Sequence, residues 1–140
     1  MRPPAISGAG LSQRILVIED DALLRDAVVL ILDQGGYLVA TTGTGQGAAD
    51  IVARFAPDLI LLDIQLPDTT GLHVLSRLRA LGHRMPIVMM TANNRPETVR
   101  DVMTMGGTGY LLKPFNPQDL VARVRLALKA DPGSSEFTDI

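Results

Sequence analysis

The sequence predicts an α/β fold in which five parallel strands alternate with five helices. Two observations indicate it: five short apolar runs bounded by acids, glycines or prolines, and stretches of helical periodicity between them. The runs are continuous rather than alternating, which is typical of strands buried on both faces of a parallel sheet. Right-handed crossovers then give a doubly wound (βα)5 domain. The predicted strands are 15–18, 37–41, 59–62, 87–91 and 110–112.

The helices are predicted from apolar spacing and from residues that start or stop a helix. After the first strand, apolar residues at i, i+3, i+4, i+7 and i+8 begin at Leu24 and end before Gly35-Gly36. Similar patterns stop at Pro57 and near Gly82. A fourth helix is predicted at 95–105 with a proline in its first turn, and Asn116 is the candidate N-cap of the fifth.

Length and composition indicate one globular domain. The chain has 140 residues, of which 46% are hydrophobic and 20% are charged. A net charge of −2 without a basic cluster predicts no nucleic-acid surface, and the absence of cysteine excludes disulfides. The longest apolar run, 27–32, is too short for a membrane span. We expect a cytoplasmic protein with a flexible leader (1–13), a folded domain (14–130) and a tail or linker start (131–140).

Chemically active side chains follow four of the five predicted strands. In parallel sheets of this kind, ligands bind outside the carboxyl ends of the strands. The first strand leads into three acids and the third into one, while the fourth ends on a hydroxyl and the fifth leads into an ammonium group. The residues concerned are Glu19, Asp20, Asp21, Asp63, Thr91 and Lys113.

This set suits phosphoryl transfer to a carboxylate. Carboxylates gathered in one cleft repel each other unless a cation joins them, and Mg²⁺ prefers such oxygen ligands. Without metal, repulsion should raise at least one carboxylate pKa. Asp63 is the candidate nucleophile, and Lys113 and Thr91 would stabilise the incoming phosphoryl oxygens. Nothing in the set activates water strongly, so we expect a phosphoryl acceptor rather than an enzyme with turnover.

Each residue taken alone has an ordinary structural explanation. Asp20 and Asp21 are suited to capping a helix, and Asp63 is suited to a turn. Thr91 is a common strand residue, and Lys113 is typical of a solvated surface. The combination of all four strand ends, rather than any single residue, therefore carries the hypothesis.

Four motifs in the sequence resemble the receiver domain of two-component response regulators. They span 15–21, 61–71, 89–92 and 109–115, and the resemblance covers about residues 14–129. It implies a flavodoxin-like sheet of order 2-1-3-4-5. It also implies that a sensor histidine kinase or a histidine phosphotransfer protein donates the phosphoryl group, and that a downstream effector or output domain responds. Catalysis would be limited to the domain's own phosphorylation and slow dephosphorylation.

The resemblance also assigns roles to single residues. Asp63 matches the phosphoacceptor, and Glu19 and Asp20 match the acidic pair that holds Mg²⁺ with it. The backbone carbonyl of Gln65 matches a further metal ligand. Thr91 matches the switch threonine, and Lys113 matches the lysine of the family site. Tyr110 matches the aromatic residue that turns inward, and Pro114 matches the cis proline.

The sequence departs from the family pattern in two places that bear on function. Glu19 stands where aspartate is commonest, and with its extra methylene it would reach the ion through a water molecule. Asp119 and Arg123 resemble residues of a dimer face, but the acidic residues of the fifth strand that would complete this face are absent. A homodimer through the 95–129 face is therefore an open expectation.

Other functions fit part of the sequence. The run Gly43-Thr-Gly45-Gln-Gly47-Ala48 is close to a dinucleotide-binding fingerprint, and Asp63 lies 20 residues beyond Gly43. That alternative leaves the acids after the first strand and Lys113 unexplained. A flavin-binding module is also less suitable, since three acids there would repel the flavin phosphate. A metal-dependent phosphatase and a receiver that works without phosphorylation fit the set less well.

Overall fold

The computed structural model describes residues 12–129. A five-stranded sheet lies at the centre, with all neighbouring strands parallel and in the order β2-β1-β3-β4-β5. This confirms the predicted fold class and strand order. The elements are β1 (Arg14–Ile18), α1 (Ala22–Gln34), β2 (Leu38–Thr42), α2 (Ala48–Phe55), β3 (Leu59–Asp63), α3 (Gly71–Ala80), β4 (Ile87–Thr91), α4 (Pro96–Thr104), β5 (Gly109–Leu112) and α5 (Pro117–Leu128).

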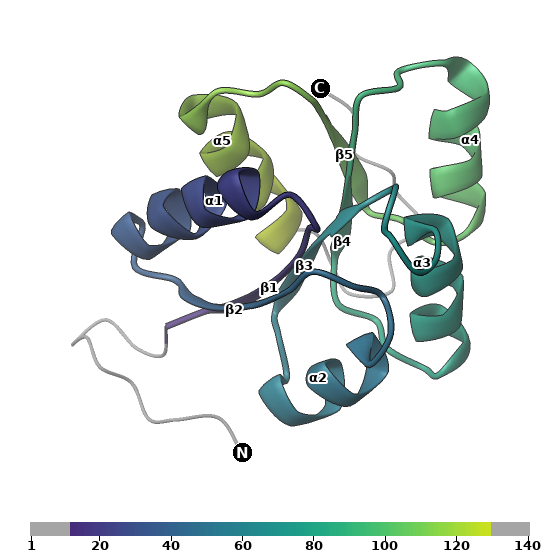
Figure 1. The fold of residues 1–140 in the computed structure, drawn as a ribbon, viewed down its shortest axis with the longest axis horizontal. Helices are drawn as coiled ribbons and strands as arrows, with labels where there is room; N and C mark the ends of the chain where they lie inside the picture. The colour runs from purple at the N-terminus through teal and green to yellow at the C-terminus, as the bar shows by residue number, and fades with distance from the viewer. Residues whose placement is uncertain (1–11, 130–140) are drawn as a thin grey trace.

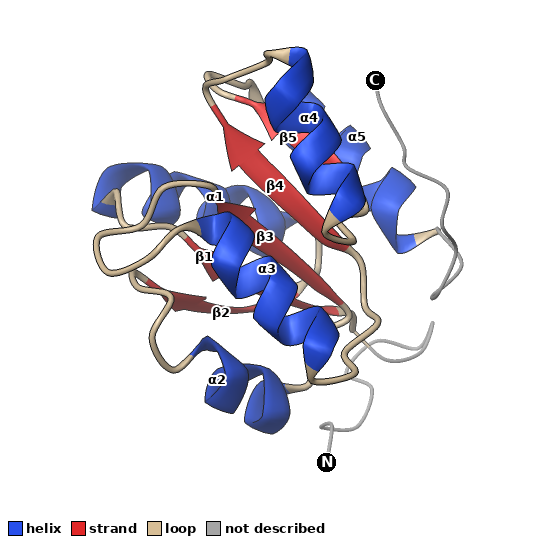
Figure 2. Ribbon diagram, turned by 90° about the vertical axis from the view of Figure 1, so that its right-hand side faces the viewer, coloured by secondary structure: helices blue, strands red, loops and turns tan. Residues whose placement is uncertain are grey.

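Helices cover both faces of the sheet. Helices α1 and α5 lie together on one face, and α2, α3 and α4 lie on the other (Figures 1 and 2). The strands are apolar because helices cover both faces of the sheet, and β3 and β4 are buried along their whole length. No helix among residues 12–129 is long and apolar enough to cross a membrane.

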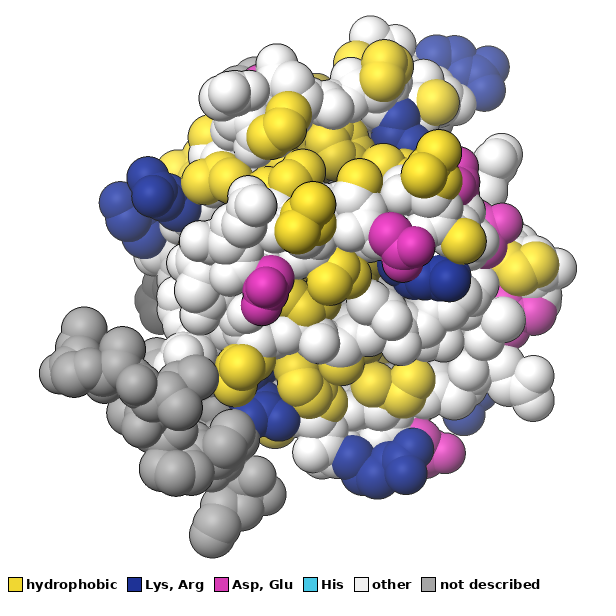
Figure 3. Space-filling model, turned by 60° about the vertical axis from the view of Figure 1, so that its left-hand side comes forward, with side chains coloured by type: hydrophobic (Ala, Val, Ile, Leu, Met, Phe, Trp, Pro, Cys, Tyr) yellow, Lys and Arg dark blue, Asp and Glu magenta, His cyan; other side chains and the backbone are white. Residues whose placement is uncertain are grey.

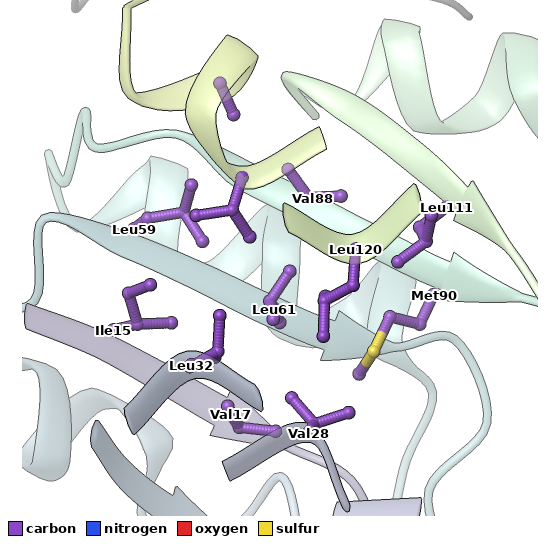
Figure 4. Packing of buried hydrophobic residues seen from close by; sticks show 12 residues of the cluster. Ile15, Val17, Val28, Leu32, Leu59, Leu61, Val88, Met90, Leu111 and Leu120 are labelled. Atoms are coloured by element: carbon purple, nitrogen blue, oxygen red, sulfur yellow. The ribbon is translucent and has the colours of Figure 1, made fainter. Parts of the chain in front are cut away.

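Two hydrophobic clusters form the core, one on each side of the sheet. Successive residues of β1 alternate between them: Ile15 and Val17 face α1 and α5, while Leu16 and Ile18 face the other three helices. Figure 4 shows how side chains from α1 and α5 converge on β1 and β3 in the first cluster. Because both faces are buried, a slip of one residue in a strand would exchange its two sets of partners.

Local signals fix where the helices begin and end. The predicted N-cap of α5 is confirmed, since Asn116 Oδ1 accepts a hydrogen bond of 2.8 Å from the backbone N–H of Asp119. Gly35 caps the end of α1, as the glycine pair predicted. The second strand lies one residue later than predicted, and α4 is shorter by one residue at each end. The leader 1–13 and the tail 131–140 lie outside the described residues, apart from 12 and 13.

Candidate functional site

The carboxyl ends of four strands bring the predicted site residues to one edge of the sheet. Glu19 follows β1, Asp63 ends β3, Thr91 ends β4 and Lys113 follows β5. Together with Asp20 they line an open cleft of about 780 Å³. The second strand of the chain lies at the sheet edge and contributes none of the residues that line this cleft. Residues up to 94 positions apart in the chain therefore meet in one place.

Three carboxylates form a cluster in the cleft. One oxygen atom from each of Glu19, Asp20 and Asp63 lies within 4.8 Å of the other two. Glu19 and Asp63 are 0% and 4% exposed, whereas Asp20 is open to solvent. Negative groups this close repel each other strongly at a buried position. A hard divalent cation with oxygen ligands, such as Mg²⁺, fits this donor set.

Lys113 forms the cationic side of the site. Its Nζ atom lies 2.8 Å from Glu19 Oε1 and 3.3 Å from Asp63 Oδ2. The other Glu19 oxygen, Oε2, accepts a hydrogen bond of 3.1 Å from the backbone N–H of Asp21. The sequence did not predict this direct bond between Lys113 and Glu19. The longer side chain of Glu19 thus reaches Lys113, and both of its oxygen atoms have a protein donor.

The protonation tendencies of this pair follow from burial and charge. Burial raises the pKa of Glu19, and Asp63 raises it further, while the hydrogen bond from Lys113 opposes the shift. Burial alone would lower the pKa of Lys113, but its bonds with Glu19 and Asp63 outweigh that effect and raise it. A raised carboxylate pKa was predicted, although burial rather than repulsion is its largest cause. The lysine stays charged, and the negative charge on Glu19 is disfavoured when no metal is bound.

The loop after β3 provides a backbone hydrogen bond to the carboxylate of Asp63. The backbone N–H of Gln65 donates a hydrogen bond of 3.1 Å to Asp63 Oδ1. Gln65 also lines the cleft, beside the acidic cluster. At the start of α3, a Cβ atom on Gly71 would collide with the backbone carbonyl oxygen of Asp63. Glycine is therefore required at this position for α3 to begin so close to the candidate phosphoacceptor.

The two predicted switch residues lie on neighbouring strands. Thr91 is 2% exposed, and its Oγ1 atom accepts a hydrogen bond of 2.9 Å from the backbone N–H of Asn93. Tyr110 on β5 is half-buried and packs against the core on the α4 side. The guanidinium of Arg123 lies 5.9 Å from the centroid of the Tyr110 ring. The Lys113–Pro114 peptide bond that follows is cis.

Arg123 faces the interior of its own domain. It resembles a residue of an intermolecular face, yet it is 3% exposed and lies beside Tyr110. Asp119, one turn earlier on α5, is exposed. The resemblance to the family placed both residues on one dimer face. Asp119 is therefore at the surface, whereas the guanidinium of Arg123 is buried, so the two residues do not share a role at an interface.

Two polar residues near the site have structural roles. Asp21 caps α1, accepting hydrogen bonds from the backbone N–H groups of Leu23 and Leu24, so the structural explanation applies to this acid. Arg25 Nη1 donates a hydrogen bond of 2.9 Å to the backbone carbonyl of Glu19. The position of Asp21 directly before a helix was a usable capping signal, but nothing local indicated the role of Arg25.

The glycine-rich loop after β2 does not form an open phosphate cradle. The backbone N–H groups of Gly45 and Gln46 donate hydrogen bonds of 2.9 Å and 2.7 Å to the carboxylate of Asp68. These are the groups that a phosphate would need at the start of a helix. The loop also follows an edge strand, whereas the strand order reverses between β1 and β3. The geometry therefore gives no support to a dinucleotide-binding fingerprint.

Comparison with known proteins identifies the family. Residues 15–125 match the response regulator receiver domain. The DNA-binding response regulator MtrA of Mycobacterium tuberculosis is 41% identical over 119 residues, which cover 85% of this chain and 52% of that protein. The probable transcriptional regulatory protein TcrX of the same organism is 35% identical over 115 residues, 82% of this chain and 49% of that protein. The chain thus spans about half the length of these curated relatives.

Solved structures show the same fold. The BeF3-activated N-terminal receiver domain of Klebsiella pneumoniae RstA superposes with a TM-score of 0.79 at 32% identity, covering 84% of this chain and all of that one. The chemotaxis response regulator CheY4 of Vibrio cholerae gives a TM-score of 0.78 at 29% identity, with 83% and 98% of the two chains covered. The chain belongs to the response regulator receiver domain family, the signalling modules of two-component systems.

Proposed function

We propose that this domain is a phosphorylation-activated switch whose phosphoacceptor is Asp63. The supporting observation is the position of the Asp63 carboxylate, nearly buried in the cleft between an acidic cluster and the ammonium group of Lys113. Mg²⁺ would be held by Glu19, Asp20, Asp63 and the backbone carbonyl of Gln65. The phosphoryl donor would be a sensor histidine kinase or a histidine phosphotransfer protein.

The chemistry of the transfer follows from the arrangement of charges. A carboxylate oxygen of Asp63 attacks phosphorus, and the new O–P bond forms as the bond between phosphorus and the donor atom breaks. The leaving group keeps the electron pair and takes a proton from solvent. A bound Mg²⁺ supplies positive charge for the phosphoryl oxygens. Lys113 provides a second, fixed positive charge 3.3 Å from Asp63 Oδ2.

Hydrolysis of the acyl phosphate is expected to be slow. The described residues that line the cleft include acids, Thr91, Asn93 and Lys113 but no histidine. Glu19, Asp20 and Asp63 would be engaged by Mg²⁺ or Lys113, so an incoming water would find no free general base among them. The domain would act on its own phosphoryl group only, which is the behaviour of a signalling module rather than an enzyme with turnover.

A phosphoryl group on Asp63 would act on the surface through Thr91. Its hydroxyl, now bonded to the backbone of Asn93, would turn to a phosphoryl oxygen, and Tyr110 would move inward behind it. Such a change remodels the face formed by residues 95–129 only if both contacts favour the new state energetically. This face would then bind a downstream effector or output domain, or a second copy of the chain. Since Arg123 is buried here, a homodimer would need other contacts.

The phosphodonor would approach over α1 and α5. Leu23 and Leu30 on α1 are 82% and 59% exposed, and Leu126 on α5 is 39% exposed. Figure 3 brings this side of the molecule forward and shows hydrophobic side chains spread over it, with acidic and basic side chains among them. Asp21 and Lys113 line both the cleft and a neighbouring shallow hollow, and this hollow connects the face of α1 and α5 to the site. An apolar partner surface docked here would lie next to Asp63.

The domain boundaries and the cellular location remain predictions from the sequence. We assign the receiver to 14–130, a leader to 1–13 and a tail or linker start to 131–140. We also propose a cytoplasmic location, where a kinase could present its phosphoryl group. The longer curated relatives are named as DNA-binding or transcriptional regulators, so a DNA-binding effector is the output class that we favour.

Intact-mass measurement tests the phosphoacceptor. Incubation with acetyl phosphate and Mg²⁺ should add one phosphoryl group to the wild-type chain and none to Asp63→Asn. Asp26→Asn, which alters an exposed acid on α1, is the matched control and should be modified like the wild type. Equal modification of Asp63→Asn and the control would place the phosphoacceptor elsewhere.

A further inference from the structure

Asp68 joins the loop after β3 to the loop after β2. Its Oδ1 atom accepts a hydrogen bond of 2.9 Å from the backbone N–H of Gly45, and its Oδ2 atom accepts one of 2.7 Å from that of Gln46. The two loops are more than 20 residues apart in the chain. These hydrogen bonds lower the pKa of Asp68, the one from Gly45 most strongly. The carboxylate thus stays charged and bonded at neutral pH.

Packing between the same two loops provides independent evidence for a built contact. A Cβ atom on Gly45 would collide with Cγ2 of Thr69 and would lie 2.8 Å from Cγ2 of Val74. Only glycine allows the backbone at this position to come so close to the residues beside Asp68. The two loops therefore meet through both van der Waals contact and paired hydrogen bonds.

The loop that carries Asp68 also carries the site. It starts at Asp63 and folds back on itself, since the backbone N–H of Leu66 donates to the carbonyl of Thr69 at 3.2 Å and that of Gly71 donates to the carbonyl of Ile64 at 2.8 Å. Gln65 lies on the first arm of this turn and pairs with Thr70 on the second. Asp68 lies at the tip. A constraint at the tip therefore limits movement of the arm next to Asp63.

We propose that Asp68 is a positioning residue for the phosphoacceptor site. By bonding to Gly45 and Gln46, it anchors the 64–70 loop on the start of α2 and so holds the Gln65 carbonyl ready for the metal. Its role is preorganisation: without the anchor, metal binding must also order the loop, which weakens affinity. Because Asp68 is exposed, water can replace it at both N–H groups, so the fold itself depends little on it. This inference rests on the proposed function.

Metal titrations on the full chain test the anchor. Asp68→Ala should weaken Mg²⁺ binding roughly five- to tenfold, a change of about 1–1.4 kcal/mol. Asp68→Asn keeps one acceptor oxygen and should be intermediate. Asp50→Asn, an exposed acid on α2, is the matched control and should bind Mg²⁺ like the wild type. NMR shifts of the Gly45 and Gln46 amides report directly whether the anchor is broken.

Phosphorylation kinetics separate positioning from a general loss of structure. Asp68→Ala should accept phosphoryl from acetyl phosphate slowly at low Mg²⁺ and at the wild-type rate at saturating Mg²⁺, with a thermal midpoint close to the wild type. Unchanged Mg²⁺ affinity in a variant with shifted Gly45 and Gln46 amides would overturn the inference. A lowered midpoint with a rate that saturating Mg²⁺ does not restore would also overturn it. If the wild type itself takes up neither Mg²⁺ nor phosphoryl, the proposed function fails first.

Discussion

The two ends of the sheet use charged residues in opposite ways. At the amino ends of the strands, the guanidinium of Arg79 donates hydrogen bonds to the backbone carbonyls of Gly106, His83 and Met85, at 2.9, 3.0 and 2.7 Å. At the carboxyl ends, by contrast, Lys113 faces carboxylates that also face one another. The arginine at the amino ends bonds to fixed backbone groups. The cluster of charged side chains at the carboxyl ends, by contrast, has an excess of negative charge.

The charged residue at the amino end of the sheet serves stability, and those at the carboxyl end serve function. Arg79 ties the end of α3 to the turn between α4 and β5, so its hydrogen bonds are complete in the protein alone. The acidic cluster is complete only with a cation, and its residues raise the energy of the metal-free state. Sites that bind ligands often carry such a cost in stability. Substitutions at the amino end should therefore change stability alone, and substitutions at the carboxyl end should change metal binding most.

The largest effect on stability is expected at the amino end. Arg79→Ala leaves three backbone carbonyls without their charged donor and should lower the free energy of unfolding by about 2–4 kcal/mol. Urea denaturation measures this loss, and Arg77→Ala, an exposed arginine on the same helix, is the control. Mg²⁺ affinity should be unchanged below the denaturation range. A parallel loss of Mg²⁺ affinity in Arg79→Ala would remove the separation between the two ends.

At the carboxyl end, Asp20→Asn should affect metal binding instead. Loss of one carboxylate should weaken Mg²⁺ binding roughly tenfold or more, about 1.4 kcal/mol, with little change in metal-free stability. An NMR or calorimetric titration measures the affinity, and Asp33→Asn, an exposed acid on α1, is the control. Equal affinities for Asp20→Asn and the wild type would place the metal elsewhere.

The pH dependence of stability sharpens the same comparison. The folded-state pKa of Glu19 is raised above 4.5, so its contribution is full below about pH 4.5 and is lost as pH rises through the folded pKa. The raised pKa of Lys113 matters only in the alkaline range, by the same rule. Without Mg²⁺, the wild type should therefore lose stability relative to Glu19→Gln as the pH rises above about 4.5. Glu97→Gln, an exposed acid on α4, should show no such trend.

Only a small change in stability is expected at Thr91. Thr91→Ala should accept phosphoryl on Asp63 and should change the free energy of unfolding by only about 1 kcal/mol. In the wild type, a phosphate mimic such as beryllium trifluoride should move NMR signals of Tyr110 and of the 95–129 face. In Thr91→Ala those shifts should be confined to residues next to Asp63. Wild-type shifts across the face in the variant would show that Thr91 does not couple the site to the surface.

Local patterns predicted the fold well because the determinants of each element are close in sequence. Apolar runs fixed the strands, and Asn116 and the glycine pair at Gly35 fixed helix ends within a residue. The candidate site was predictable to the same extent, since the chain order places Asp63, Thr91 and Lys113 at the ends of strands. Parallel pairing then brings them to one edge.

Contacts between distant residues were not predictable in this way. The bond between Glu19 and Lys113 joins residues 94 positions apart. Asp68 lies directly after a proline, and nothing near it in the sequence indicated Gly45 as its partner. The family resemblance placed Arg123 on a surface, but a guanidinium can turn along its flexible stem toward a ring such as that of Tyr110. These features require the assembled fold.

The place of Tyr110 beside Arg123 has a practical consequence for optical measurements. The chain contains two tyrosines and no tryptophan, and Tyr37 packs against the core on the α1 and α5 side. Replacing Tyr37 by phenylalanine would leave Tyr110 as the sole natural fluorophore, with a guanidinium 5.9 Å from its ring centroid. Its emission would then report the surroundings of one side chain at the edge of the sheet. The unlabelled protein thus carries its own spectroscopic probe, suited to stopped-flow recording.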